Sequence, residues 1–221
     1  MRYLTPLLTA ACLVALIPGS AHGQGFEIGL KGGLNVATLS VDDPADPDLG
    51  FDSVTDFLVG AYLQCGGIGW FTLQGEVLYS QNGAKLQGED PEVRIELNYI
   101  RVPILFMARL GSREGPINPI LYLGPQVALE TRCGVSGQSD GVSRSFACDS
   151  EEFDEPIETN NVEFGLVFGG GFEVPVSRFT VQIDARYNLG LSNINAGTDA
   201  SSVSLHNRGW SFGAGFAMPF G

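Results

Sequence analysis

Hydrophobic and polar residues alternate at every second position over long stretches of this chain. Between residues 26 and 37, one face would carry Phe26, Ile28, Leu30, Gly32, Leu34 and Val36. The other face would carry Glu27, Gly29, Lys31, Gly33 and Asn35. A period of two is that of a β-strand, in which successive side chains point to opposite sides. No stretch shows a helical period, so the pattern predicts an all-β fold.

The alternation recurs along the chain and predicts eight strands, separated by turn-rich segments. They are 26–37, 57–64, 70–81, 94–109, 120–130, 161–174, 179–189 and 210–218. In 94–109, Ile95, Leu97 and Tyr99 follow one phase, whereas Ile100 and Val102 follow the other. A β-bulge near Tyr99–Arg101 would explain this slip, and Pro103 would then lie where a ladder bond is already lost.

The connecting segments alternate in length. Segments 41–54, 81–93, 131–160 and 192–206 are long, 65–69 and 175–178 are short, and 111–119 is intermediate. Long loops at one end and short turns at the other are typical of outer-membrane barrels, whose long loops are extracellular. An even number of strands places both termini at the short-turn end.

The polar face of the predicted strands is unsuited to a water-exposed surface. It holds mostly Gly, Ser, Thr, Gln and Asn with few charges, whereas a soluble lipocalin-like barrel would turn a solvated polar face outward. We therefore predict an eight-stranded antiparallel up-and-down transmembrane β-barrel with its apolar face toward lipid. Its narrow interior would hold a network of mutually compensating charges, because an unpaired buried charge costs several kcal/mol: Glu27, Lys31, Glu76, Asp184 and Arg186.

Residues 1–23 read as a secretory signal peptide, which leaves 24–221 as the barrel domain. Arg2 is followed by an apolar run from Leu4 to Ile17, and small residues flank a cleavage site before Gln24. No other run is long enough for a membrane-spanning helix. The composition fits export to a membrane, since only 17% of residues are charged, below the ~25% of soluble domains. A net charge of −13 argues against nucleic acid as a partner.

Several short motifs, taken in order and spacing, carry a resemblance to a known family. They are 29–35 (GLKGGLN), 74–83 (QGEVLYSQNG), 97–103 (LNYIRVP), Gly124-Pro125 and 186–190 (RYNLG), together with an aromatic last strand that ends in Phe220. The chain resembles the OmpA-like or PorT-type outer-membrane β-barrel domain family over essentially its whole mature length. The resemblance implies that Phe220 is the assembly signal read by the barrel-assembly machinery, although Gly221 follows it. The resemblance implies a location in the outer membrane and a barrel fold, but no particular activity.

The candidate chemistry is sparse. Cys133 and Cys148 lie in the longest loop and are predicted to form a disulfide in an oxidising compartment; a metal pair is the alternative. Cys65 is either a buried thiol or an intermolecular partner. Acidic runs at 42–48 and 149–155 could bind Ca²⁺, but neither has a recognised ligand spacing, so we expect no metal or cofactor.

A catalytic site is not expected either. The predicted mature chain has one histidine, His206, and a set of Ser204 or Ser211 with His206 and Asp184 would be split between a loop edge and the deep interior. We expect a non-enzymatic outer-membrane protein in contact with lipid. Its role would be structural or one of surface recognition, through long acidic extracellular loops that meet an unknown extracellular ligand or protein. The alternatives are a narrow pore or component of a transport or secretion system, and a soluble periplasmic lipocalin-like binder.

Overall fold

The computed structural model describes residues 25–42, 51–65, 70–86, 93–111, 115–139, 142–148, 160–194 and 204–220. The predicted signal peptide and the acidic runs, apart from Asp42, lie outside these residues. The described part holds nine strands: β1 (Phe26–Asp42), β2 (Phe51–Cys65), β3 (Phe71–Leu86), β4 (Val93–Arg109), β5 (Asn118–Ser139), β6 (Val142–Ala147), β7 (Val162–Val176), β8 (Phe179–Gly190) and β9 (Ser204–Phe220).

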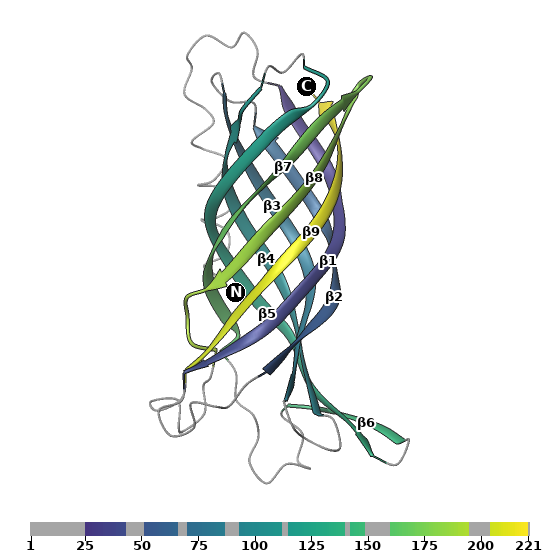
Figure 1. The fold of residues 1–221 in the computed structure, drawn as a ribbon, viewed down its shortest axis with the longest axis vertical. Helices are drawn as coiled ribbons and strands as arrows, with labels where there is room; N and C mark the ends of the chain where they lie inside the picture. Colours follow the sequence, from purple (N-terminus) through teal and green to yellow (C-terminus); the bar gives the residue numbers. More distant parts are fainter. Residues whose placement is uncertain are drawn as a thin grey trace, which may run out of the picture.

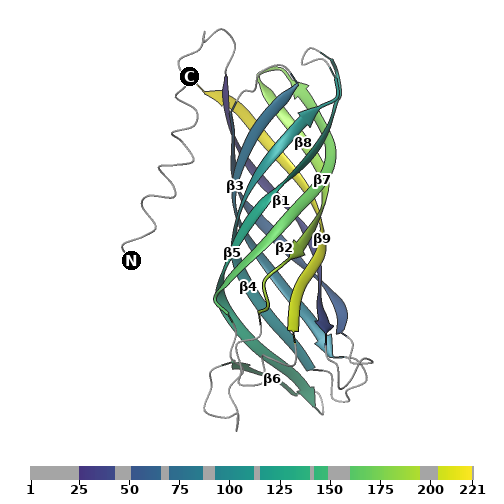
Figure 2. The same cartoon turned by 90° about the vertical axis from the view of Figure 1, so that its left-hand side faces the viewer.

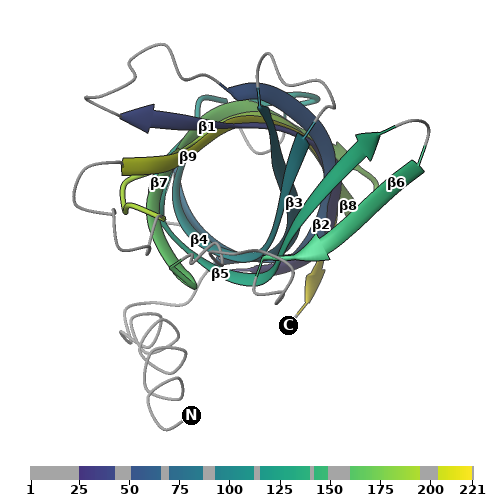
Figure 3. The same ribbon diagram turned by 90° about the horizontal axis from the view of Figure 1, so that it is seen from below.

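Eight of these strands close into an antiparallel barrel, as the alternation predicts (Figure 1). Each barrel strand pairs with its neighbours along the chain, and β1 closes the ring by pairing with β9 from Phe26↔Phe220 to Asp42↔Ser204. Figure 3 looks along the closed ring and shows β6 outside it. Strand β6 forms a hairpin with β5 and lies within the segment 131–160 that was predicted as a loop.

The two faces of the barrel wall point as predicted. Leu30 is 71% exposed on the outside, whereas the next residue, Lys31, is 2% exposed on the inside. The outward band is continuous around the wall and includes Leu34, Val59, Val77, Phe106, Leu123, Phe168, Ile183 and Phe216. The buried set is largely polar and includes Asn35, Gln74, Glu76, Gln126, Gln182, Arg186 and Ser211. This arrangement excludes the lipocalin-like alternative, in which the apolar face would line the interior.

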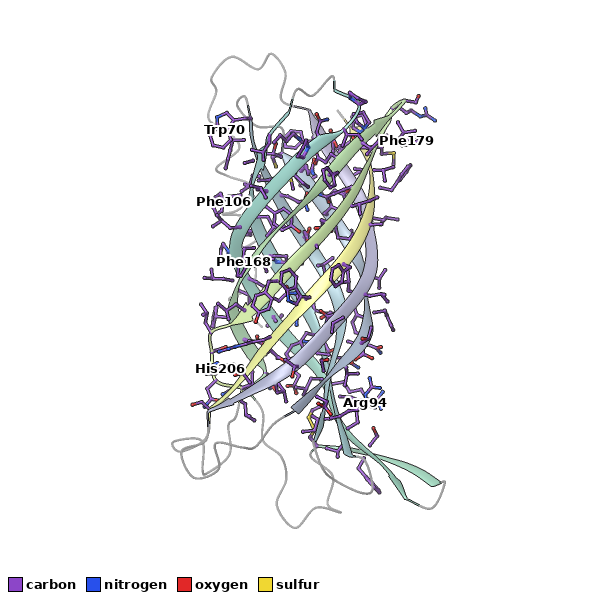
Figure 4. The ribbon with its side chains drawn as sticks, viewed as in Figure 1. Trp70, Arg94, Phe106, Phe168, Phe179 and His206 are labelled. Atoms are coloured by element: carbon purple, nitrogen blue, oxygen red, sulfur yellow. A yellow bond between two sulfur atoms is a disulfide. The ribbon has the colours of Figure 1, made fainter. Side chains whose placement is uncertain are left out.

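Aromatic side chains gather on the outside of the wall. Phe26 lies against Phe220, and Phe71 stacks on Phe106 with ring centroids 6.2 Å apart. Farther from the termini, Tyr187 packs edge-on against Trp210 at 5.3 Å. Figure 4 shows Trp70, Phe106, Phe168 and Phe179 directed away from the bore at different heights. Outward aromatic residues are typical of the lipid-facing surface of an outer-membrane barrel.

The strands are longer than a bilayer requires. A tilted transmembrane strand needs about 9–11 residues, but β1 has 17 and β5 has 22. The excess lies at the end with the longer connections, opposite Phe26 and Phe220, where β4 and β5 continue toward β6 (Figure 2). The barrel wall therefore extends past the membrane on the loop-bearing side.

The predicted bulge in 94–109 is wrong in its details. Strand β4 keeps one phase throughout, with these residues all buried in the interior: Leu97, Tyr99, Arg101, Pro103, Leu105, Met107 and Arg109. A register shift does occur at Asn98/Tyr99, but the extra residue is Thr131 in β5, since Asn98 pairs with Arg132 and Tyr99 with Glu130. The apparent slip arose because apolar residues of β4 fill the loop-bearing end of the bore.

The turn between β7 and β8 carries an unusual backbone conformation. Ser177 is the first central residue of the two-residue turn that connects Val176 and Phe179, and its φ is 58°. Hairpin turns of type II′ require a positive φ at this position, where glycine is the preferred residue.

We expect Ser177→Gly to stabilise the folded barrel by about 0.5–1 kcal/mol, because glycine adopts this conformation without the steric cost of a Cβ. The effect is measured as the urea concentration at which half of the folded gel band, which migrates differently from heated protein, is lost. Ser177→Val should shift the midpoint in the opposite direction; equal midpoints for both variants would contradict the assignment of the turn.

Close approach of backbones explains one of the interior glycines. A Cβ added to Gly33 in β1 would lie 2.1 Å from the carbonyl oxygen of Phe212 in β9, a distance that no real Cβ adopts. Gly75 of β3 lies on the outward phase of its strand, and a Cβ added to it would have nothing within 4 Å.

Gly33→Ala is therefore expected to cost at least 1–3 kcal/mol, the usual range for overpacking, since the two strands must separate. Gly75→Ala serves as the matched control and should change the free energy of unfolding little. The same urea titration separates the two, and equal costs would show that glycine flexibility rather than strand spacing matters.

Candidate functional site: the barrel interior and its loop-bearing end

Four charged side chains meet in the middle of the bore. Lys31 of β1 places its Nζ 3.1 Å from Glu76 of β3 and 3.1 Å from Asp184 of β8. Arg186 of β8 donates to Glu76 at 2.5 Å and to Asp184 at 2.8 Å. The group contains two cations and two carboxylates, so its formal charge is zero. We call these four residues the central charge cluster.

Neighbouring strands surround the central charge cluster with hydrogen bonds. The hydroxyl of Tyr122 in β5 donates to Asp184, and the Tyr122 ring lies 5.4 Å from the guanidinium of Arg186. Gln74 donates to Glu76 at 2.5 Å. Arg186 of β8 and Glu76 of β3 lie four strands apart around the ring of eight, so the ion pair between them crosses the bore.

A second ion pair lies nearer the short-turn end. Arg109 at the end of β4 donates to Glu173 of β7 at 2.5 Å and to the Thr72 hydroxyl at 2.7 Å. Gln64 donates to Glu173 at 2.9 Å and to Gln74 at 2.7 Å, which connects this pair to the central charge cluster. Arg109 and Glu173 lie on the inward phase of their strands, and that phase was the signal that could have identified them.

Toward the loop-bearing end, uncharged side chains form a chain of hydrogen bonds along the inner wall from β8 through β9 and β1 to β3. Asn35 donates to Asn82 at 2.8 Å, Ser211 donates to Asn35 at 2.8 Å, and Asn188 donates to Ser211 at 2.8 Å. Beyond them lies an apolar cluster of buried residues that the alternation did not predict: Leu39, Leu97, Tyr99, Ala128 and Ile194.

The structure brings together four of the five charges predicted for the interior. Glu27 is the exception: it is half-buried, one of its carboxylate oxygens has no hydrogen-bond partner, and it forms no ion pair with the residues that the structure describes. Its position near the start of β1, opposite Gln64 and Pro219, places it closer to the short-turn end than the other four. Phe220, the predicted assembly signal, pairs with Phe26 and is half exposed.

A disulfide joins Cys133 of β5 to Cys148, which directly follows β6, with Cα atoms 5.5 Å apart. The amide of Cys148 also donates to the carbonyl of Cys133 at 3.4 Å. The bond therefore fixes the base of the β5–β6 hairpin to the barrel wall. Cys65 ends β2 near the opposite end and is half-buried beside the register positions of Phe26 and Leu73.

His206, Ser211 and Asp184 have partners other than one another. The Nδ1 atom of His206 lies 3.1 Å from the carbonyl oxygen of Ser192, at the loop-bearing end (Figure 4). Ser211 donates to Asn35, and Asp184 belongs to the central charge cluster. Within the described ranges, no group of three or more His, Cys, Asp or Glu side chains is arranged to hold a metal ion. No helix in those ranges is both long and apolar enough to cross a membrane.

The closed antiparallel sheet, the outward apolar band and the polar interior define a transmembrane β-barrel. The chain belongs to the outer membrane protein β-barrel domain family, which it matches over residues 20–196. It is a bacterial outer-membrane protein, and the match does not single out the OmpA-like or PorT-type groups. No curated protein is similar enough in sequence to count as a relative.

Solved structures show the same fold. The outer-membrane protein OprG of Pseudomonas aeruginosa superposes with a TM-score of 0.56 at 12% identity, over 90% of this chain and 97% of that chain. The Escherichia coli outer membrane protein W superposes with a TM-score of 0.50 at 11% identity, over 90% of this chain and all of that chain. At these identities the similarity concerns the fold alone.

Proposed function

We propose that this protein is a non-enzymatic, non-conducting barrel that presents a recognition surface outside the cell. The observation that carries the proposal is the contrast between the two ends of β5. At one end its side chains contribute to a bore crossed by hydrogen bonds and ion pairs. At the other, β5 continues past its β7 partner into a hairpin that is fixed by a disulfide and lies outside the barrel ring.

The interior supports the non-conducting part of the proposal. An ion that crosses the bore would have to displace the compensating charges of the central charge cluster and pass the apolar cluster around Tyr99 and Ile194. Eight-stranded barrels are just wide enough for side chains to fill. The filled interior therefore favours a role as a membrane anchor over a role as a channel.

The test has two arms. Planar-bilayer recordings of the purified full-length protein should show no steady single-channel current, whereas steady currents would support the alternative of a narrow pore or transport component. On intact cells, a photo-crosslinking residue at Ser143 in β6 should capture a protein from outside the cell. The same residue at Arg178, in the short turn at the opposite end, is the matched control. Absence of capture from Ser143, or equal capture from Arg178, would contradict surface recognition.

A further inference from the structure

The β5–β6 hairpin ends the sheet in a strand edge. Among the strands that the structure describes, β6 pairs with β5 alone. The pairing runs without a register shift from Gly134↔Ala147 to Ser139↔Val142. Every strand of the barrel wall has partners on both sides, so β6 is the one described strand with a single partner. In Figures 1 and 3 it lies away from the wall.

The register defines which backbone groups face that edge. The amide of Cys148 donates to the carbonyl of Cys133, so this opposed pair is of the hydrogen-bonded type. In an antiparallel ladder, hydrogen-bonded and non-hydrogen-bonded pairs alternate. Residues 142, 144 and 146 therefore direct their backbone groups toward β5. Ser143, Ser145 and Ala147 direct their N–H and C=O groups away from it.

This edge lacks several devices that normally prevent strand addition. Natural edge strands are protected by short length, charged side chains, proline, bulges, covering segments or inward-pointing charges, and of these β6 carries one charged residue, Arg144. The sequence of β6, VSRSFA, contains no proline and its register contains no bulge. Its six residues match the average length of a strand in a sheet. The disulfide fixes one end of this template in place, which reduces the entropy lost when a partner binds.

We propose that β6 binds an extended segment of another protein, which adds to the sheet as a further antiparallel or parallel strand along Ser143, Ser145 and Ala147. This inference rests on the proposed role in surface recognition and names its partner class. The acidic run 149–155 directly follows the β5–β6 hairpin in the sequence and outweighs Arg144, the one charged residue of β6, so a segment with net positive charge is attracted. A second copy of the same acidic chain is repelled.

Binding of a defined peptide tests the proposal directly. The full-length protein is placed in phosphatidylcholine nanodiscs, and the probe is a fluorescent peptide of alternating lysine and valine. We expect saturable binding that is at least about tenfold weaker for Ser145→Pro, which removes an outward N–H and places a ring at the edge. Proline at this position takes no donor from the β5–β6 ladder. Ser145→Ala, the matched control, removes the side chain, keeps the N–H, and should bind like the wild type.

A second measurement needs no variant of the protein. N-methylation of alternate residues of the peptide keeps its charge but removes strand-pairing donors, and should also weaken binding to the wild type at least about tenfold. Non-reducing gels verify that the disulfide is formed in Ser145→Pro. The proposal is overturned if the wild type does not bind the peptide. It is also overturned if Ser145→Pro or the N-methylated peptide binds as well as its control.

These outcomes are separable from those that test the proposed function. If Ser143 captures a protein on cells with the same yield in Ser145→Pro, surface recognition holds and strand addition at β6 is wrong. If Ser143 captures nothing, surface recognition itself fails.

Discussion

Leu30→Arg is expected to destabilise the folded barrel by about 2–4 kcal/mol, the cost of an arginine near the midplane of a bilayer on the lipid face. Leu30 is 71% exposed on the outside of β1, four residues from the terminal Phe26. In a water-soluble protein, the same substitution at so exposed a site would usually change stability by no more than about 0.5 kcal/mol. Urea unfolding in lipid vesicles, followed by tryptophan fluorescence, measures the difference.

Leu110→Arg provides the matched control for this experiment. Leu110 is 61% exposed and directly follows β4 at the short-turn end, where an arginine reaches the interface and should cost only about 0–1 kcal/mol. A cost for Leu30→Arg no greater than that for Leu110→Arg would contradict the lipid-facing orientation of the apolar band.

Glu76→Leu is expected to cost about 3–5 kcal/mol, because removal of one partner leaves buried charges uncompensated. Glu76 accepts from both Lys31 and Arg186 and is 2% exposed. The double variant Lys31→Met/Glu76→Leu restores charge balance. It should cost less than the sum of the single variants, with a coupling energy above about 1 kcal/mol.

A partly exposed ion pair provides the comparison for the coupling expected in the bore. Arg94 and Asp56 lie 2.7 Å apart near the loop-bearing end, where about a third of the Arg94 side chain is exposed. Loss of this pair in Asp56→Asn should cost less than loss of Glu76, about 1 kcal/mol, because water reaches the Arg94 side chain and partly screens the pair. If the Lys31 and Glu76 substitutions prove additive, or if Glu76→Leu costs no more than Asp56→Asn, then water fills the bore and the cluster is not sealed.

The outward face of the wall could be predicted from the sequence because alternation encodes it directly. Leu30 and Lys31 are adjacent in the chain, and their chemical contrast alone indicates opposite faces. Strand β6 could not be predicted in this way, since VSRSFA and the facing GVSGQS of β5 show no alternation of apolar and polar residues. The misplaced bulge has a related cause. Leu97 and Tyr99 are apolar but point into the bore, so at this end the polarity of a residue does not indicate which face of the wall it lies on.

The partners within the bore required the three-dimensional register. Lys31, Glu76 and Asp184 are far apart in the chain, and their heights in the bore depend on how far each strand is displaced along its neighbours. The sequence identified these residues as inward-facing charges. It could not show that Glu27 lies outside the cluster, or that Arg109 pairs with Glu173.

The most direct test of the central claim, that lipid contacts the apolar face, uses the two tryptophans of the chain. Trp70 and Trp210 are 67% and 49% exposed on the outside of the barrel. In vesicles of brominated phosphatidylcholine, their fluorescence should be strongly quenched, and more so with bromine near the headgroup than near the end of the acyl chain. Fluorescence unaffected by brominated lipid but quenched by acrylamide would show that these residues meet water, and would contradict the account.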